Sequence, residues 1–278
     1  MSMPDGQEIY EQAQRVKNEL WSLDLEQLLG DAPQNLRIVA EGDSWFDYPI
    51  GVDILDHLRM VHGYAVYKVA KAGDTIDNMV YGGQIAHTLA AVARHRPKVV
   101  LFSAGGNDIA GYEFESLLNH RKSGLPILRE AYIDYLFRTA FKTAYETFMI
   151  RVWEIDPAIK IVTHGYANAI PDGRGLFGRS REVDLFPPIE FLGPWLRPAL
   201  LKKGVTDPVE SEGTVRNVIN RFNAMLKQLS NEHERCIYLD LRPIIGRSDW
   251  VNELHLTNDG FRRVANVFRD AIRAAIGK

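Results

Sequence analysis

The sequence predicts an α/β fold in which a parallel β-sheet carries helices on both faces. Five short apolar runs alternate with amphipathic segments of helical spacing along the 278 residues. The apolar runs stop on glycine and small polar residues, which is typical of buried strands that end in tight turns. This alternation indicates parallel strands joined by right-handed crossovers. Because the sequence has no internal repeat and no linker-like break, we expect one domain over residues 1–278.

The strands are predicted from apolar, partly β-branched runs at residues 36–41, 64–69, 98–102, 159–163 and 237–241. An amphipathic helix over about residues 7–29 precedes the first strand and is expected to pack outside the core. The first of these strands runs directly into Gly42, Asp43 and Ser44, so a serine follows a strand end. In an open α/β sheet, ligands bind in the crevice beyond the strand ends.

The remaining helices follow from apolar residues at helical spacing and from stop and start signals. A glycine, Gly63, ends the second helical pattern, and the paired glycines Gly82 and Gly83 suggest a break in the third. Thr257 or Asn258 is expected to cap the final helix. The predicted helices after the first one are residues 52–61, 75–95, 130–155, 207–232 and 259–276.

Residues 165–200 depart from the regular alternation, since they are rich in glycine and proline and carry several large aromatic residues. A loop of this length in a compact domain is usually functional, and its aromatic content argues against disorder. One interpretation is a lid or wall over an apolar substrate. The other is a segment that covers a sheet edge or forms an oligomer contact. The aromatic residues are Phe177, Phe186, Phe191 and Trp195.

Composition narrows the functional classes. The chain has 46% hydrophobic and 25% charged residues with a net charge of −3, so it lacks the basic character typical of nucleic-acid-binding domains. We find no apolar stretch near the ~20 residues that span a bilayer and no apolar core of a secretory signal in the first residues. We therefore expect a cytoplasmic protein, with a mature secreted form as the alternative. The single cysteine, Cys236, is expected to be a buried thiol.

Four positions near predicted strand ends suggest acyl-transfer chemistry: Ser44, Gly73, Asn107 and His255. A serine hydroxyl is a weak nucleophile that needs a neighbouring base, and histidine titrates near the working pH. Attack on a carbonyl produces an oxyanion, which fixed N–H donors stabilise. The backbone N–H groups of Ser44 and Gly73 and the side-chain amide of Asn107 are candidate donors. Taken alone, Ser44, Gly73 and Asn107 also fit ordinary turns, and His255 fits a surface histidine before a helix. The assignment therefore depends on the four together.

These residues resemble the SGNH, or GDSL-type, esterase and lipase family. The resemblance lies in four blocks in the family's order, Gly42-Asp43-Ser44, Gly73, Gly106-Asn107-Asp108 and His255. It implies a three-layer flavodoxin-like sandwich with a five-stranded parallel sheet in the order 2-1-3-4-5. It also implies hydrolysis without a metal or other cofactor, and a small-molecule ester as substrate. Ser44, Gly73, Asn107 and His255 would be the family's four functional residues.

Two departures from the family pattern affect the site. The family usually has aspartate three residues before the histidine, where this chain has Asn252. An asparagine carbonyl can fix the imidazole tautomer but supplies no charge. A backbone carbonyl or Asp249 is the alternative partner, and a Ser–His dyad is also possible, while Glu253 is expected to point elsewhere.

Aromatic residues next to the serine form the second departure. Trp45 and Phe46 follow Ser44 where the family often has leucine and a small polar residue. With Tyr48 and Trp195, they are candidates for substrate binding, and core packing is the alternative for the three that follow Ser44.

The sequence thus predicts a serine hydrolase of carboxylic esters or thioesters. A carbohydrate or glycan O-deacetylase would use the same residues. A degenerate, catalytically inactive binding module is the alternative from a different class, suggested by Asn252. We find no dinucleotide-binding glycine motif after the first strand, no phosphate-binding Walker lysine and no cluster of metal ligands in the sequence. The oligomeric state is left open.

Overall fold

The computed structural model describes residues 6–22, 33, 36–176 and 192–277. Its centre is a five-stranded parallel sheet in the order β2-β1-β3-β4-β5, which confirms the predicted fold class and strand order. Each strand begins and ends within two residues of its predicted position. The strands are β1 (Arg37–Gly42), β2 (Ala65–Lys68), β3 (Val99–Ser103), β4 (Lys160–His164) and β5 (Cys236–Leu239).

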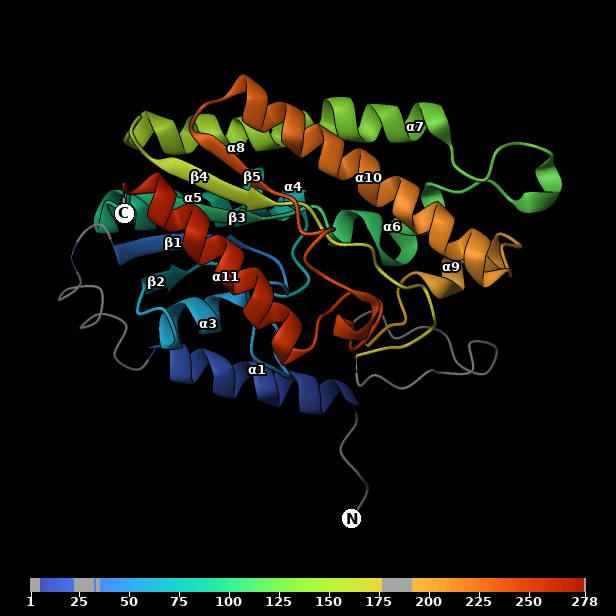
Figure 1. The fold of residues 1–278 in the computed structure, drawn as a ribbon, viewed down its shortest axis with the longest axis horizontal. Coiled ribbons are helices and arrows are strands. Elements are labelled where there is room, and N and C mark those ends of the chain that lie inside the picture. Colours follow the sequence, from blue (N-terminus) through green and yellow to red (C-terminus); the bar gives the residue numbers. More distant parts are fainter. Residues whose placement is uncertain (1–5, 23–32, 34–35, 177–191, 278) are drawn as a thin grey trace, which may run out of the picture.

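Helices cover both faces of this sheet, as Figure 1 shows. On one face α3 and α11 pack against each other and against the strands, and α1 lies outside α3. On the other face α5 and α10 contact the strands, and α8 packs against both of these helices. The helices on the first face are α1 (Gly6–Ser22), α3 (Ile54–Met60) and α11 (Asn258–Ala275). Those on the second are α4 (Ile76–Val80), α5 (Gln84–His95), α8 (Lys142–Ile155) and α10 (Pro208–Glu232).

Short helices near the carboxyl ends of the strands were not predicted. They have six residues each, which is too short for a periodic pattern to identify. The unpredicted α-helices are α6 (Gly111–Ser116) and α9 (Arg197–Lys202), and 3₁₀ turns lie at Asn107–Ile109, Arg121–Ser123 and Arg247–Asp249. The equally short α7 (Glu130–Tyr135) is the start of the helix predicted over 130–155. The predicted helix over 130–155 is continuous, but residues Leu136–Phe141 form a π-helical segment between α7 and α8.

The predicted break at Gly82 and Gly83 is confirmed, because α4 and α5 are separate helices. A Cβ on Gly82 would lie 2.6 Å from the carbonyl oxygen of Asn78, so the chain turns where only glycine fits. The final helix begins where Thr257 caps it, with the hydroxyl accepting from the backbone N–H of Gly260.

The described part of the first helix is Gly6–Ser22, which lies within the predicted range of about residues 7–29 except at its first residue. The predicted continuation beyond Ser22 stays a prediction. Residues 23–32 lie outside the described part of the chain. The helix is attached to α3 by charge, since Nζ of Lys17 lies 2.5 Å from Asp53 and 2.9 Å from Asp56. These contacts hold α1 against the outer side of α3 (Figure 1), while its Trp21 packs into the core.

Residues 177–191 also lie outside the described part, so Phe177, Phe186 and Phe191 cannot be placed. The flanking residues 165–176 and 192–196 are irregular and largely buried, and α9 follows them. The predicted lid or wall therefore stays a prediction. Among the described helices, we find none with the length and apolarity that crossing a membrane requires.

Candidate active site

The turn after β1 is held too tightly to admit any side chain at Gly42. A Cβ there would lie 2.8 Å from both Cβ and the carbonyl oxygen of Ser103, which ends the neighbouring strand β3. The carboxylate of Asp43 accepts hydrogen bonds from the N–H of Trp45 and the hydroxyl of Ser103, both at 3.0 Å. The turn thus projects the half-buried Ser44 beyond the sheet edge.

Asp43 belongs to a buried polar network beneath this turn. Its second oxygen accepts from the hydroxyl of Tyr166, which in turn accepts from the N–H of Gly106 at 3.0 Å. Burial raises the pKa of Asp43 to about 6. Ser103 extends the network, since its hydroxyl lies 2.8 Å from Nε2 of His164. The ends of β1, β3 and β4 are therefore joined directly under the serine.

Ser44, His255 and Asn252 are aligned by hydrogen bonds. Nε2 of His255 lies 2.8 Å from Oγ of Ser44, and Nδ1 lies 3.0 Å from Oδ1 of Asn252. Oδ1 of Asn252 also accepts the backbone N–H groups of Leu254 and His255, at 2.9 and 2.7 Å. Because this oxygen is an acceptor, Nδ1 must carry the ring proton, which leaves Nε2 free to accept from the serine.

The imidazole of His255 is buried, with 4% of its surface exposed. Tyr48 stacks on one face with ring centroids 4.5 Å apart, and Trp195 meets the ring edge-on at 5.5 Å. Burial lowers the pKa of His255 to about 3. The ring is therefore neutral at physiological pH, the state that a general base requires.

The acidic neighbours of Asn252 are occupied elsewhere. Asp249 accepts the N–H of Gly246 at 2.8 Å and pairs with Arg263. Glu253 is fully buried and points away from His255, as expected. Of the alternatives for the third position, the described residues thus favour Asn252.

Glu253 instead anchors the irregular segment. Its carboxylate accepts backbone N–H groups from Gly173, Trp195, Leu196 and Arg197 at 2.6 to 3.1 Å. Burial raises the pKa of Glu253 to about 7. Sequence reasoning did not find this role, because no local pattern reveals which distant N–H groups a carboxylate will meet.

The predicted oxyanion donors lie along one rim. Asn107 donates one N–H of its amide to the carbonyl oxygen of Asp74 at 2.8 Å, which holds the amide in place and leaves its second N–H for another acceptor. Gly73 has φ of +85°, and a Cβ there would meet no atom within 4 Å. Asp108 accepts the N–H of Ile76 at 3.0 Å and so ties this rim to the start of α4.

Two pockets open from Ser44. The inner one, of about 50 Å³, is mostly apolar and lies between Ser44, Asn107 and the α10 residues Val218 and Ile219. The outer one, of about 300 Å³, also has Ser44 and Asn107 in its wall and adds Gly73 and His255. Four of the five residues predicted for catalysis and oxyanion binding thus line one pocket, and the fifth, Asn252, contacts His255 behind it.

The four predicted substrate-binding aromatic residues divide between pocket and core. Trp45 lines the inner pocket and Trp195 the outer pocket. Phe46 is completely buried and packs against His164 and Phe268, so its position corresponds to the core alternative. Tyr48 lines neither pocket and lies against His255 instead.

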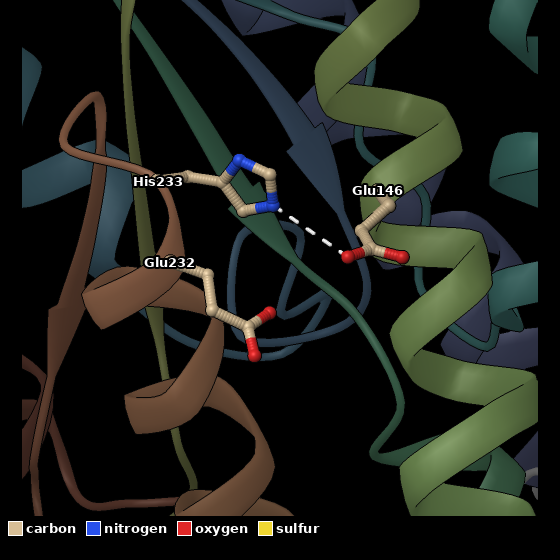
Figure 2. A group of neighbouring side chains, drawn as sticks. All are labelled: Glu146, Glu232 and His233. Carbon is tan, nitrogen blue, oxygen red and sulfur yellow. Dashed lines mark ion pairs between the residues drawn. The ribbon is translucent and has the colours of Figure 1, made fainter.

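A possible metal-ligand group lies at the opposite edge of the sheet. Glu146 on α8, Glu232 at the end of α10 and His233 before β5 have ligand atoms within 4.8 Å of one another. Figure 2 shows the ring of His233 facing Glu146. Nε2 of His233 lies 3.5 Å from a carboxylate oxygen of Glu146. The ammonium of Lys142 lies 2.7 Å from Glu232 and 3.8 Å from Glu146, so a cation of the protein already pairs with both carboxylates. The group is an ion-pair network between α8 and α10, remote from Ser44.

The family model of the GDSL-like lipase/acylhydrolase family matches residues 40–263, from the end of β1 into α11. The chain belongs to this family. The resemblance seen in the sequence is thereby confirmed. No curated protein matches the sequence significantly.

Solved structures share the GDSL-like fold at low sequence identity. An extracellular lipase from Streptomyces rimosus is 15% identical, with a TM-score of 0.54 over 84% of this chain and 99% of that one. A phospholipase A1 from Streptomyces albidoflavus is 12% identical, with a TM-score of 0.51 over 84% and 98%. A protein from Slackia heliotrinireducens assigned to the SGNH hydrolases is 14% identical, with a TM-score of 0.51 over 84% and 97%. At these identities the likeness concerns the fold.

Proposed function

We propose that the protein hydrolyses carboxylic esters or thioesters through an acyl-enzyme formed on Ser44. Family membership supports ester hydrolysis in general. The observation that carries the serine mechanism is the 2.8 Å contact between Oγ of Ser44 and Nε2 of a buried, neutral His255. A serine needs such a base within hydrogen-bond reach to act as a nucleophile.

In this mechanism, Oγ of Ser44 attacks the carbonyl carbon while its proton moves to Nε2 of His255. The tetrahedral intermediate then collapses, the bond to the leaving alcohol or thiol breaks, and His255 returns the proton to it. Water attacks the acyl-enzyme in the same way and releases the acid together with free Ser44. Asn252 keeps the proton on Nδ1, so Nε2 is the basic nitrogen throughout.

The oxyanion of each intermediate requires N–H donors at the opening. We propose that these donors are the backbone N–H groups of Ser44 and Gly73 and the second amide N–H of Asn107, which does not bond to Asp74. All three residues line the outer pocket, which supports this assignment.

The substitution Ser44→Ala tests the proposal. We expect hydrolysis of p-nitrophenyl acetate to fall to the background rate without a change in melting temperature, because the serine is only half-buried. Ser123→Ala, at an exposed serine remote from the pockets, is the matched control. Full activity in Ser44→Ala would refute the nucleophile.

A second candidate reaction, carbohydrate O-deacetylation, is favoured by the lining of the outer pocket. That lining combines the aromatic rings of Tyr112 and Trp195 with the charged groups of Glu113, Glu115 and Lys202, a combination suited to a hydroxylated leaving group. Release of acetate from an acetylated sugar, compared with hydrolysis of p-nitrophenyl acetate, tests it. A degenerate binding module would show neither activity and no reaction with a fluorophosphonate.

A further inference from the structure

The two pockets that meet at Ser44 differ sixfold in volume, at about 50 and 300 Å³, and also differ in chemistry. The inner pocket is lined by buried side chains such as Phe114, Val215, Val218 and Ile219, each at most 5% exposed. The outer pocket contains the charged and aromatic groups described above. An ester bound at Ser44 therefore meets two unlike environments on either side of its carbonyl.

The position of His255 decides which part of the ester enters which pocket. His255 lines the outer pocket and not the inner one. The leaving oxygen or sulfur must receive its proton from Nε2 of this ring, so the leaving group lies in the outer pocket. The acyl chain, on the other side of the carbonyl carbon, then enters the inner pocket past Ser44 and Asn107.

The inner pocket limits the length of that chain. One water-sized group needs about 10–15 Å³ of such space, so about 50 Å³ holds roughly three to five non-hydrogen atoms. Its α10 wall is fixed in place, because Asn223 on the same helix donates to the carbonyl oxygen of Tyr166 at 3.1 Å and accepts from Tyr238 at 2.5 Å. A Cβ on Gly165 would lie 1.8 Å from Oδ1 of Asn223, so the helix already packs against the end of β4 without free space.

We propose that the acyl substrates are short, about two to four carbons long, and that Val218 and Ile219 of α10 set this limit. The inference rests on the proposed function of Ser44. It concerns acyl length, which that proposal leaves open.

The wild-type protein gives the first test, through kcat/KM for p-nitrophenyl acetate, butyrate, hexanoate and octanoate. We expect the highest values at acetate or butyrate and a fall of at least tenfold by octanoate. A profile that rises to octanoate would overturn the inference. This test needs no variant, so it stands even if a substitution in the core impairs folding.

Val218→Ala gives the second test, with Val209→Ala as its control. Both substitutions remove the same atoms from α10, but Val218 is 2% exposed and Val209 is 78% exposed. We expect the hexanoate-to-butyrate ratio of kcat/KM to rise about tenfold in Val218→Ala, the gain for two further methylene groups leaving water. Val209→Ala should keep the wild-type ratio. Equal ratios in a folded Val218→Ala and in the control would contradict the assignment of the acyl pocket.

Labelling with a small fluorophosphonate separates failure of this inference from failure of the proposed function. If Ser44 is labelled and long acyl chains are preferred, only the pocket assignment is wrong. If Ser44 is not labelled and no ester is hydrolysed, the proposed function fails and the inference fails with it.

Discussion

Oδ1 of Asn252 lies 3.0 Å from Nδ1 of His255, at a position where an aspartate would place a negative charge. The amide fixes the tautomer but does not stabilise the imidazolium that forms during proton transfer. Burial lowers the pKa of His255, and among the described residues we find no carboxylate that offsets this effect. This difference leads to a prediction about pH dependence.

Asn252→Asp should move the acid limb of the pH–activity profile to higher pH. His255 acts as a base only when neutral, and in the native protein its pKa of about 3 keeps it neutral well below pH 6. A carboxylate beside Nδ1 favours the protonated ring and raises its pKa by about 1–3 units. The variant should therefore lose activity at a higher pH than the wild type, as measured by kcat/KM from pH 4 to 8.

Asn231→Asp, at an exposed residue at the end of α10, controls for net charge. Superimposable profiles for Asn252→Asp and wild type would refute the prediction.

Asn107→Ala should lower kcat by about 10²–10³-fold, the usual effect of removing one oxyanion donor. KM should change little, because the donor acts mainly on the charge that develops in the transition state. Steady-state kinetics with p-nitrophenyl acetate would measure both constants. A rise in KM with unchanged kcat would assign Asn107 to ground-state binding instead.

Gly73→Ala and Gly63→Ala form a matched pair. Both glycines have positive φ, +85° and +70°, and at neither would a Cβ meet an atom within 4 Å. Each substitution should cost about 1–2 kcal/mol of unfolding free energy through backbone strain alone. Alanine keeps the backbone N–H, so any fall in kcat must come from the strain at φ +85° moving this proposed oxyanion donor. We expect such a fall only in Gly73→Ala, which lines the outer pocket, and not in Gly63→Ala, which follows α3. Denaturant unfolding and kinetics on both variants would measure the two effects, and equal kcat values would show that the strain at Gly73 does not reach the reaction.

Glu253→Gln should change how stability depends on pH. The pKa of Glu253 is raised from 4.5 to about 7, so between these values the folded protein holds a proton that the unfolded chain has released. The unfolding free energy therefore falls as pH rises through this window, and this part of the fall should disappear in the variant. An amide also cannot accept at both ends, so two buried N–H groups lose their partner and stability drops by about 2 kcal/mol or more.

Urea unfolding at pH 5, 6, 7 and 8 would measure both effects of Glu253→Gln. The exposed Glu234→Gln is the control. If plots of unfolding free energy against pH run parallel for wild type and Glu253→Gln, the protonation of Glu253 does not change on folding.

The sheet was predictable because each strand is a buried apolar run that ends on a turn signal, and the alternation with helices then restricts the topology. Ser44 was found for the same reason, since it follows the turn signal after β1. His255 was found instead from its place ahead of the final helix and from the family resemblance. Neither α6 nor α9 was predictable, because six residues carry no helical period.

The details of the site depend on long-range contacts that local patterns do not contain. The carboxylate of Glu253 meets N–H groups 56 to 80 residues away. For Tyr48 the sequence left substrate binding and core packing as alternatives, and it did not reveal the stacking on His255, a residue near the opposite end of the chain. The volume of the inner pocket depends on how closely α10 packs against the end of β4, which only the tertiary structure determines.

The central claim is that His255 activates Ser44. Mass spectrometry of the protein after reaction with a fluorophosphonate tests it most directly, because only an activated serine reacts readily. The account predicts one adduct, on the peptide containing Ser44, that forms at least 100-fold more slowly in His255→Ala, roughly the lower end of what a positioned base contributes. An adduct on another residue, or one on Ser44 that forms equally fast without His255, would contradict it.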